Sequence, residues 1–224
     1  MMGPERSEGG PGTERDMTFK DVVTTVEELR ALMGEPSELA LRKDIGRLDE
    51  HCRAFIARSP FVLVSTSDRA GRCDVSPKGD APGFVEVLDE RHLVIPDRPG
   101  NKRYDGIRNL IENPGIGLLF LVPRSEETLR VNGRAQVVRD PEVLARFAVQ
   151  GKLPQLAIAV EVQESFLHCA KCVKRSGLWD MEKWPDLTGL PSAAQMLHDH
   201  ARPTNMTVDG MQQRLQDGYR KNLY

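Results

Sequence analysis

Short apolar and β-branched runs, each ended by a turn, recur between residues 61 and 170 and limit the folds open to this chain. "FVLVSTS" ends at "DRAGR", the turn "LDER" separates two short runs, and "GIGLLFLV" is followed by "PRSEE". Two longer runs, "TLRVNGRAQVVR" and "QLAIAVEVQESFLHCA", complete the series. Runs at this spacing predict antiparallel strands rather than a parallel α/β sheet. We therefore expect five or six strands in a small antiparallel barrel, with one or two helices inserted.

Length and composition fit one single-core domain with extensions, or at most two small domains. The chain has 224 residues, of which 39% are hydrophobic and 29% are charged, as in ordinary globular proteins. The formal net charge of −2 argues against a binder of nucleic acid or membrane surfaces, since such proteins are usually basic.

The first 16 residues lack the apolar core of a secretory signal. Their glycine, proline and charge content predicts a disordered leader over residues 1–16. The chain contains no apolar run of membrane-spanning length. We expect a cytoplasmic location, in which the four cysteines stay reduced.

Two helices are expected before the strands. Thr25 and Glu28 have the spacing of a capping box before "VEELRALM". Ser37 is placed to cap a following helix. That helix is expected to continue through the periodic apolar positions Leu41, Ile45, Leu48, Cys52 and Phe55.

The stretch "HCAKCVKRSGLWD" raises the question of a metal or thiol site. His168, Cys169 and Cys172 supply three ligands, but structural zinc needs four, and no second closely spaced cysteine pair exists. The histidine precedes the cysteines, which is the wrong order for covalent heme attachment, and a βαβ context for a redox pair is missing. We favour compact buried cysteines without a metal, and keep a zinc or thiol protein as a weaker alternative.

A second basic stretch, "NKRYD", follows the glycine turn "RPG" at the expected start of a helix. Free backbone N–H groups and the helix dipole attract phosphate at such a place. Lys102 and Arg103 are unfavourable at a helix N-terminus unless an anion compensates them, and Asn101 adds an amide. The pattern indicates an anion site, although a solvated charged first turn remains open. Lys78 and Arg130 stand at or within strands, where a cation could meet a polar ring edge.

Residues 55–139 resemble the pyridoxamine 5′-phosphate oxidase-like, FMN-binding split-barrel superfamily. The resemblance rests on the order of "VSPKGD", "IPDRPGNKR", "RNLIENP", "GIGLLFLVP" and "LRVNGRA". Within the superfamily the chain is similar to a group of probable FMN-dependent enzymes that carry a segment like "HCAKCVKRSGLWD". The resemblance spans residues 37–185 and implies a mainly β, α+β fold: an antiparallel split β-barrel over residues 17–185, followed by a helical extension over residues 186–224.

The resemblance also implies a homodimer with FMN at the subunit interface and a set of cofactor-binding residues. Lys102, Arg103 and Asn101 match the phosphate-binding positions. Other matching positions run along the flavin ring, contact its polar edge or reach the pocket, and these are Val75, Ser76, Lys78, Ile95, Pro96, Thr128, Arg130, Lys171 and Arg175. Negative charge develops near N1 and O2 of reduced flavin, so a cation such as Lys78 favours hydride acceptance.

The implied function is an FMN-dependent oxidoreductase acting on an unknown small molecule. The chain has "KRSGLWD" where the true oxidase has its substrate-binding arginine segment, so pyridoxamine phosphate is not the expected substrate. No general acid or base is identified, and hydride transfer can proceed through orientation alone. A non-catalytic flavin carrier or sensor, and the same barrel with deazaflavin or heme, remain as alternatives.

Overall fold

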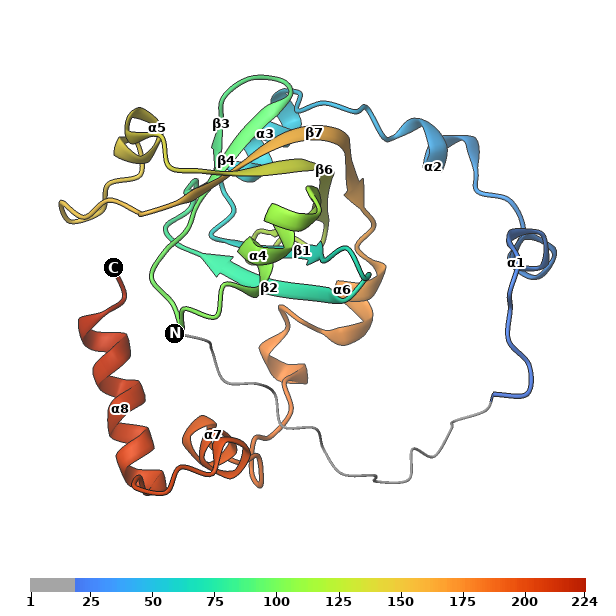
Figure 1. Ribbon diagram of the computed structural model, residues 1–224. Coiled ribbons are helices and arrows are strands. Elements are labelled where there is room, and N and C mark those ends of the chain that lie inside the picture. Colours follow the sequence, from blue (N-terminus) through green and yellow to red (C-terminus); the bar gives the residue numbers. More distant parts are fainter. Residues whose placement is uncertain (1–18) are drawn as a thin grey trace. The chain divides into compact units, whose positions relative to one another are not determined.

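The structure is a computed structural model that describes residues 19–224 (Figure 1). The leader expected at residues 1–16 lies outside these residues. The chain divides into two compact units, residues 1–41 and 42–224. Within residues 19–224, no helix has the length and apolar character needed to cross a membrane.

The N-terminal unit contains the two capped helix starts that the sequence predicts. Helix α1 (Val26–Met33) is capped by Thr25, whose hydroxyl accepts a hydrogen bond from Glu28 N at 3.1 Å. The Glu28 carboxylate in turn accepts from Thr24 N at 3.0 Å. Helix α2 (Glu38–Arg42) begins after Ser37, whose hydroxyl accepts from Ala40 N at 3.2 Å.

The expected continuation of the second helix through Phe55 is wrong. Helix α2 ends at Arg42, and a separate helix, α3 (Glu50–Ile56), begins eight residues later. Gly46 has φ +60°, a left-handed conformation that interrupts a helix. Asp49 then caps α3 by accepting from Cys52 N at 2.9 Å. The apolar residues on the two sides of this interruption therefore do not share one helical face, and Ile45, which lies between the two helices, is 42% exposed.

Seven strands form one antiparallel sheet in the order β2-β1-β5-β6-β7-β4-β3. This is the split-barrel α+β fold expected from the sequence, with seven strands in place of five or six. The strands are β1 (Phe61–Ser67), β2 (Cys73–Gly79), β3 (Glu86–Val87), β4 (His92–Pro96), β5 (Gly115–Leu121), β6 (Thr128–Val138) and β7 (Ala157–His168).

Helices are inserted between the strands and follow them. They are α4 (Asp105–Glu112), α5 (Pro141–Ala145), α6 (Lys171–Ser176), the 3₁₀ turn η1 (Met181–Lys183), α7 (Ala193–Ala201) and α8 (Val208–Lys221). Asp140 caps α5 by accepting from Glu142 N at 3.0 Å. Helices α7 and α8 make up most of the helical extension predicted after residue 186, and they pack on each other.

The larger hydrophobic cluster lies on one face of the sheet, because strand side chains alternate between its two faces. Val64, Leu118 and Val131 are neighbours across β1, β5 and β6, and all three are buried. Helix α4 lies against β1, β2 and β6 (Figure 1) and adds Ile107 and Leu110 to this core. Helix α3 adds Cys52 and Ile56 to the same core, and the contact of α4 with β2 brings the loop before α4 beside that strand. A smaller cluster of Val94, Leu144, Phe147 and Ala157 lies on the other face of the sheet.

A β-bulge interrupts the long β6–β7 ladder. Asn132 pairs with Glu164 and Gly133 pairs with Val162, so Gln163 has no counterpart. A Cβ atom at Gly133 would overlap the carbonyl oxygen of Glu161. Glycine is therefore required at this position for close backbone approach.

Replacing Gly133 with Ala should lower the free energy of unfolding by about 1–3 kcal/mol, the usual cost of forcing extra volume into a packed site. Gly218→Ala in α8 is the matched control, because a Cβ there meets nothing within 4 Å. That control should leave stability unchanged or raise it by up to about 1 kcal/mol. Chemical denaturation of both variants checks this, and equal stability of the two would contradict the role given to Gly133.

Candidate functional site

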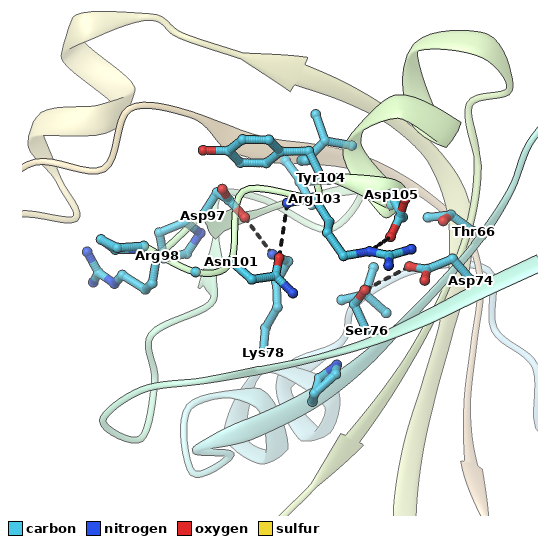
Figure 2. Close-up of a pocket in the computed structure, with 18 of the residues that line it drawn as sticks. Thr66, Asp74, Ser76, Lys78, Asp97, Arg98, Asn101, Arg103, Tyr104 and Asp105 are labelled. Atoms are coloured by element: carbon cyan, nitrogen blue, oxygen red, sulfur yellow. Dashed lines mark hydrogen bonds and ion pairs between the residues drawn. The ribbon is translucent and has the colours of Figure 1, made fainter. Parts of the chain in front are cut away.

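A cavity of about 520 Å³ lies between β1, β2, the loop after β4 and the start of α4. Its volume falls in the range of about 300–1,000 Å³ that is usual for small-molecule and cofactor sites. Figure 2 shows the polar side chains that converge on it. Those labelled are Thr66, Asp74, Ser76, Lys78, Asp97, Arg98, Asn101, Arg103, Tyr104 and Asp105. Lys102 also lines the cavity.

Strand β2 supplies one wall through its alternation. Asp74, Ser76 and Lys78 are partly buried and line the cavity, and the Ser76 hydroxyl donates to Asp74 Oδ2 at 2.7 Å. Val75 lies between them on the opposite face and is 59% exposed. The register of β2 on β1 thus determines which polar groups face the cavity.

The loop before α4 has an unusual backbone. Lys102 has φ +63° and Tyr104 has φ +57°, both in the left-handed region that non-glycine residues rarely adopt. Such residues cost about 1–3 kcal/mol each and cluster at ligand sites. The turn is supported by Arg103 N, which donates to Asn101 Oδ1 at 3.0 Å.

Helix α4 begins at Asp105, four residues later than the start predicted at Asn101. Its N-cap residue, Tyr104, makes no side-chain capping bond. The first N–H groups of α4 therefore lack a capping side chain, and Asp105, Gly106 and Ile107 of this first turn line the cavity, an arrangement that favours anions. Gly106 keeps this first turn close to β2, since a Cβ there would lie 3.3 Å from Asp74 Oδ2.

Two ion pairs fix cations in the cavity wall. Lys78 Nζ lies 2.6 Å from Asp97 Oδ1, with 19% and 14% of the two side chains exposed. Arg98 Nε lies 2.7 Å from Asp80 Oδ2. Burial acts to raise the pKa of the Asp80 carboxyl, but hydrogen bonds that include one from Arg98 outweigh it and leave that pKa below its ordinary value.

The ion pairing of the cations in the loop before α4 differs from that of Lys78 and Arg98 in the cavity wall. Arg103 Nε is 2.7 Å from Asp105 Oδ2, and the hydrogen bond to this carboxylate raises the pKa of the Arg103 guanidinium. Within residues 19–224, Lys102 has no ion-pair partner. The loop therefore offers one unneutralised ammonium group beside the open helix end.

The last residues of the chain also reach this region. Leu223 lines the cavity, and Tyr224 lines a neighbouring cavity of about 290 Å³. The Tyr224 hydroxyl donates to Asp80 Oδ1 at 2.6 Å, and Lys152 Nζ donates to the Tyr224 carbonyl at 2.7 Å. This contact could not be predicted from the sequence, because no local pattern links residues 144 positions apart.

The cavity brings together half of the cofactor-binding residues expected from the sequence: Ser76, Lys78, Pro96, Asn101, Lys102 and Arg103. It also contains Asp74, Asp97, Arg98 and Asp105, which the sequence analysis did not single out. The other expected residues do not line it. Val75 faces the other side of β2, Ile95 is buried in the core, and the remaining four are Thr128 and Arg130 on β6 and Lys171 and Arg175 on α6.

The cysteine–histidine stretch lies at the end of β7 and in α6. Cys169 and Cys172 are exposed free thiols, so the expectation that they are compact buried residues is wrong. Cys52 is buried, which raises the pKa of its thiol, and its Sγ lies 3.2 Å from Ser165 Oγ. In residues 19–224, no three His, Cys, Asp or Glu side chains are grouped as a metal site requires.

Comparison with solved structures finds similar proteins at low identity. An FMN-binding protein from Syntrophomonas wolfei is 16% identical, with 52% of this chain and 83% of that chain covered and a TM-score of 0.42. HupZ from Group A Streptococcus is 15% identical, with 53% and 92% covered and a TM-score of 0.44. An F420 reductase is 16% identical, with 52% and 94% covered and a TM-score of 0.36.

The search of curated proteins found no match. The sequence model of a protein family, described as pyridoxamine 5′-phosphate oxidase, matches residues 48–169. This range is more than half of the chain and holds all seven strands, α4 and the polar residues of the cavity wall. The chain therefore belongs to the pyridoxamine 5′-phosphate oxidase-like family of FMN-binding split barrels.

Proposed function

We propose that the chain binds FMN in the 520 Å³ cavity and acts as an FMN-dependent oxidoreductase on a small molecule. The observation that carries this proposal is the uncapped N-terminus of α4 beside Lys102 and Arg103, at one end of a polar cavity of cofactor size. Family membership supports FMN as the group bound there.

The phosphate group fits the loop and the helix end. The backbone N–H groups of α4 donate toward an anion, and the helix dipole favours negative charge there. The Lys102 ammonium and the Arg103 guanidinium add charge-assisted hydrogen bonds, and the Asn101 amide adds a neutral donor. Gly106 lets the first turn of α4 pack closely on Asp74 of β2, beside the cavity.

The ring system fits the wall formed by β2 and the end of β4. FMN, when bound, supplies the hydride-accepting chemistry, and the protein tunes its electronics. Asp97 holds the Lys78 ammonium at the wall through their 2.6 Å contact. Lys78 in that position stabilises negative charge on a reduced ring, while Pro96 and Ile158 give apolar contact.

We also propose a homodimer with two FMN molecules at the subunit interface, as the resemblance to the family implies. Exposed apolar side chains on β1 and β2, Phe61 at 38% and Val75 at 59%, are consistent with a further surface covering the sheet. Single scattered apolar residues are common on monomers. The dimer is therefore tested by the mass of the protein in solution.

A different cofactor in the same barrel is the second candidate. Deazaflavin and heme are the groups suggested by the resemblance, and an F420 reductase is among the similar structures. The helix end and its two cations favour a cofactor with a phosphate group, which heme lacks. A carrier or sensor that binds FMN without turnover has the same cavity requirements, and only an electron-transfer assay separates it from an enzyme.

Replacing both Lys102 and Arg103 with Ala should weaken FMN binding at least about 100-fold. Hydrogen bonds to charged groups contribute about 1.5–3 kcal/mol each, and the double variant removes two. The measurement is the quenching of flavin fluorescence on titration with the cofactor-free protein. The control Arg134→Ala with Arg139→Ala removes equal charge from exposed positions on and after β6. Equal FMN affinity in the two double variants would contradict the phosphate assignment.

Lys78→Met should leave FMN bound but make its reduction potential more negative, because the ammonium that favours the reduced, negatively charged ring is lost. Lys78→Arg keeps the charge and should stay nearer to the wild-type potential. Reduction against a dye of known potential measures both variants. A potential that is unchanged in Lys78→Met would remove Lys78 from the ring site and leave it as a partner of Asp97.

A further inference from the structure

The last two residues of the sequence return to the cofactor cavity after α8. Leu223 lines this cavity, and Tyr224 lines the neighbouring cavity of about 290 Å³. Leu223 is 64% exposed, as expected for a side chain at the mouth of a cavity rather than in its interior. We call Leu223 and Tyr224 the lid.

Three contacts hold Tyr224 in place. Its hydroxyl donates to Asp80 Oδ1 at 2.6 Å, and Lys152 Nζ donates to its carbonyl oxygen at 2.7 Å. The Arg98 Cζ atom lies 5.6 Å from the centroid of its ring, within the range of a cation–π attraction. The three partners come from the loop after β2, the loop after β4 and the segment before β7. The lid therefore joins parts of the chain that are far apart in the sequence.

The contact with Asp80 links the lid to the cavity wall. The Asp80 side chain is 4% exposed and pairs with Arg98, which lines the cavity. Arg98 also donates from Nη1 to the Phe147 carbonyl at 2.8 Å. The hydrogen bond to Asp80 raises the pKa of the Tyr224 hydroxyl, so this group remains a donor at neutral pH. The lid thus rests on a buried ion pair that forms part of the wall.

The lid also faces the loop that we propose holds the cofactor phosphate. The two cavities have a common set of lining residues in or just before this loop: Asp97, Arg98, Pro99, Gly100, Lys102 and Tyr104. Tyr224 and residues 152–155 form the other side of the smaller cavity. The docked lid therefore covers part of the approach to the loop.

Helix α8, which precedes the lid, contributes little to the core. It has no buried residue along its length, and it packs against α7. Residues 222–224, which follow it, are not helical. Segments with few buried apolar contacts open locally at a free energy well below that of global unfolding. The lid can therefore leave the cavity while the barrel stays folded.

We propose that Leu223 and Tyr224 close the cofactor cavity, so that the cofactor is retained while the lid is docked and enters or leaves when the lid opens. The inference rests on the proposed function, since it takes this cavity as the cofactor site. Leu223 excludes water from the cavity mouth. The bond from Tyr224 to Asp80 can break and form again without loss of the ion pair between Asp80 and Arg98. The helices α7 and α8 then serve to carry the lid.

The rates of FMN binding and release test the lid. Tyr224→Phe removes only the hydroxyl group, and Asp80 keeps its bond from Ala81 N at 2.7 Å. Both rates should rise about tenfold or more, because the closed state loses a hydrogen bond to a charged group. The lid lies across entry and exit alike, so the two rates rise together. Stopped-flow flavin fluorescence measures them, and Tyr219→Phe in α8 is the control, since Tyr219 is 66% exposed.

Two further variants change the lid by other means. A chain that ends at Asn222 lacks the lid and should exchange FMN at least as fast as Tyr224→Phe. Lys152→Gln removes the second anchor and should change both rates in the same direction. Wild-type rates in both Tyr224→Phe and the shortened chain would overturn the proposal. Faster release with an unchanged binding rate would also contradict it, since Tyr224 would then be a binding contact only.

A second measurement needs no FMN and so separates the lid from the proposed function. The sequence has three tyrosines, Tyr104, Tyr219 and Tyr224. Labelling with fluorotyrosine gives each of them a fluorine NMR signal, which is assigned by its loss in the corresponding Phe variant. The change of a signal on transfer to heavy water reports the exposure of that ring to solvent.

In the cofactor-free protein, this solvent effect on Tyr104 should increase when the chain ends at Asn222, because Tyr104 and Tyr224 line the same cavity. The effect on Tyr219 should stay the same. No increase at Tyr104 would disprove the lid even in a protein that binds FMN. An increase in a protein that binds no FMN would instead refute the proposed cofactor and support a lid over the cavity.

Discussion

The burial of alternate side chains along the antiparallel sheet is the constraint on which the remainder of the structure depends. Val64, Leu118 and Val131 meet across three strands, and each fully buried aliphatic side chain contributes about 1.5–3 kcal/mol. Because the strand period is two, the register that buries Val64 also turns Ser76 of β2 toward the cavity. A slip by one residue would put Val75 there instead and dismantle the polar wall.

The second constraint is the loop that precedes α4. Two left-handed non-glycine residues, Lys102 and Tyr104, lie in a loop that ends at an uncapped helix. This strain persists because surrounding contacts hold it, including the bond from Arg108 N to the Tyr104 carbonyl at 2.8 Å. Strained backbone of this kind is common at ligand sites. The strain in this loop is therefore explained if the loop binds an anion at the start of α4.

Much of this fold could be predicted from the sequence, because strand alternation, helix caps and turns are local signals. The strands, α1 and the cap at Thr25 follow from such signals. The break at Gly46 was missed, since the apolar spacing continued across it. The start of α4 was placed four residues too early, because nothing in "NKRYD" encodes a left-handed Lys102. Asp97 and Tyr224 could not be predicted, since their partners Lys78 and Asp80 meet them only through the tertiary fold.

The most direct test of the account is the visible spectrum of the freshly purified protein, with the released chromophore identified by its mass. Flavin absorption with release of FMN is the predicted result, and it would make the electron donor and acceptor the next questions. A colourless protein that also fails to take up added FMN would contradict the proposed cofactor. In that case the family resemblance would hold for the fold only, and deazaflavin, heme and metal would be tested in place of FMN.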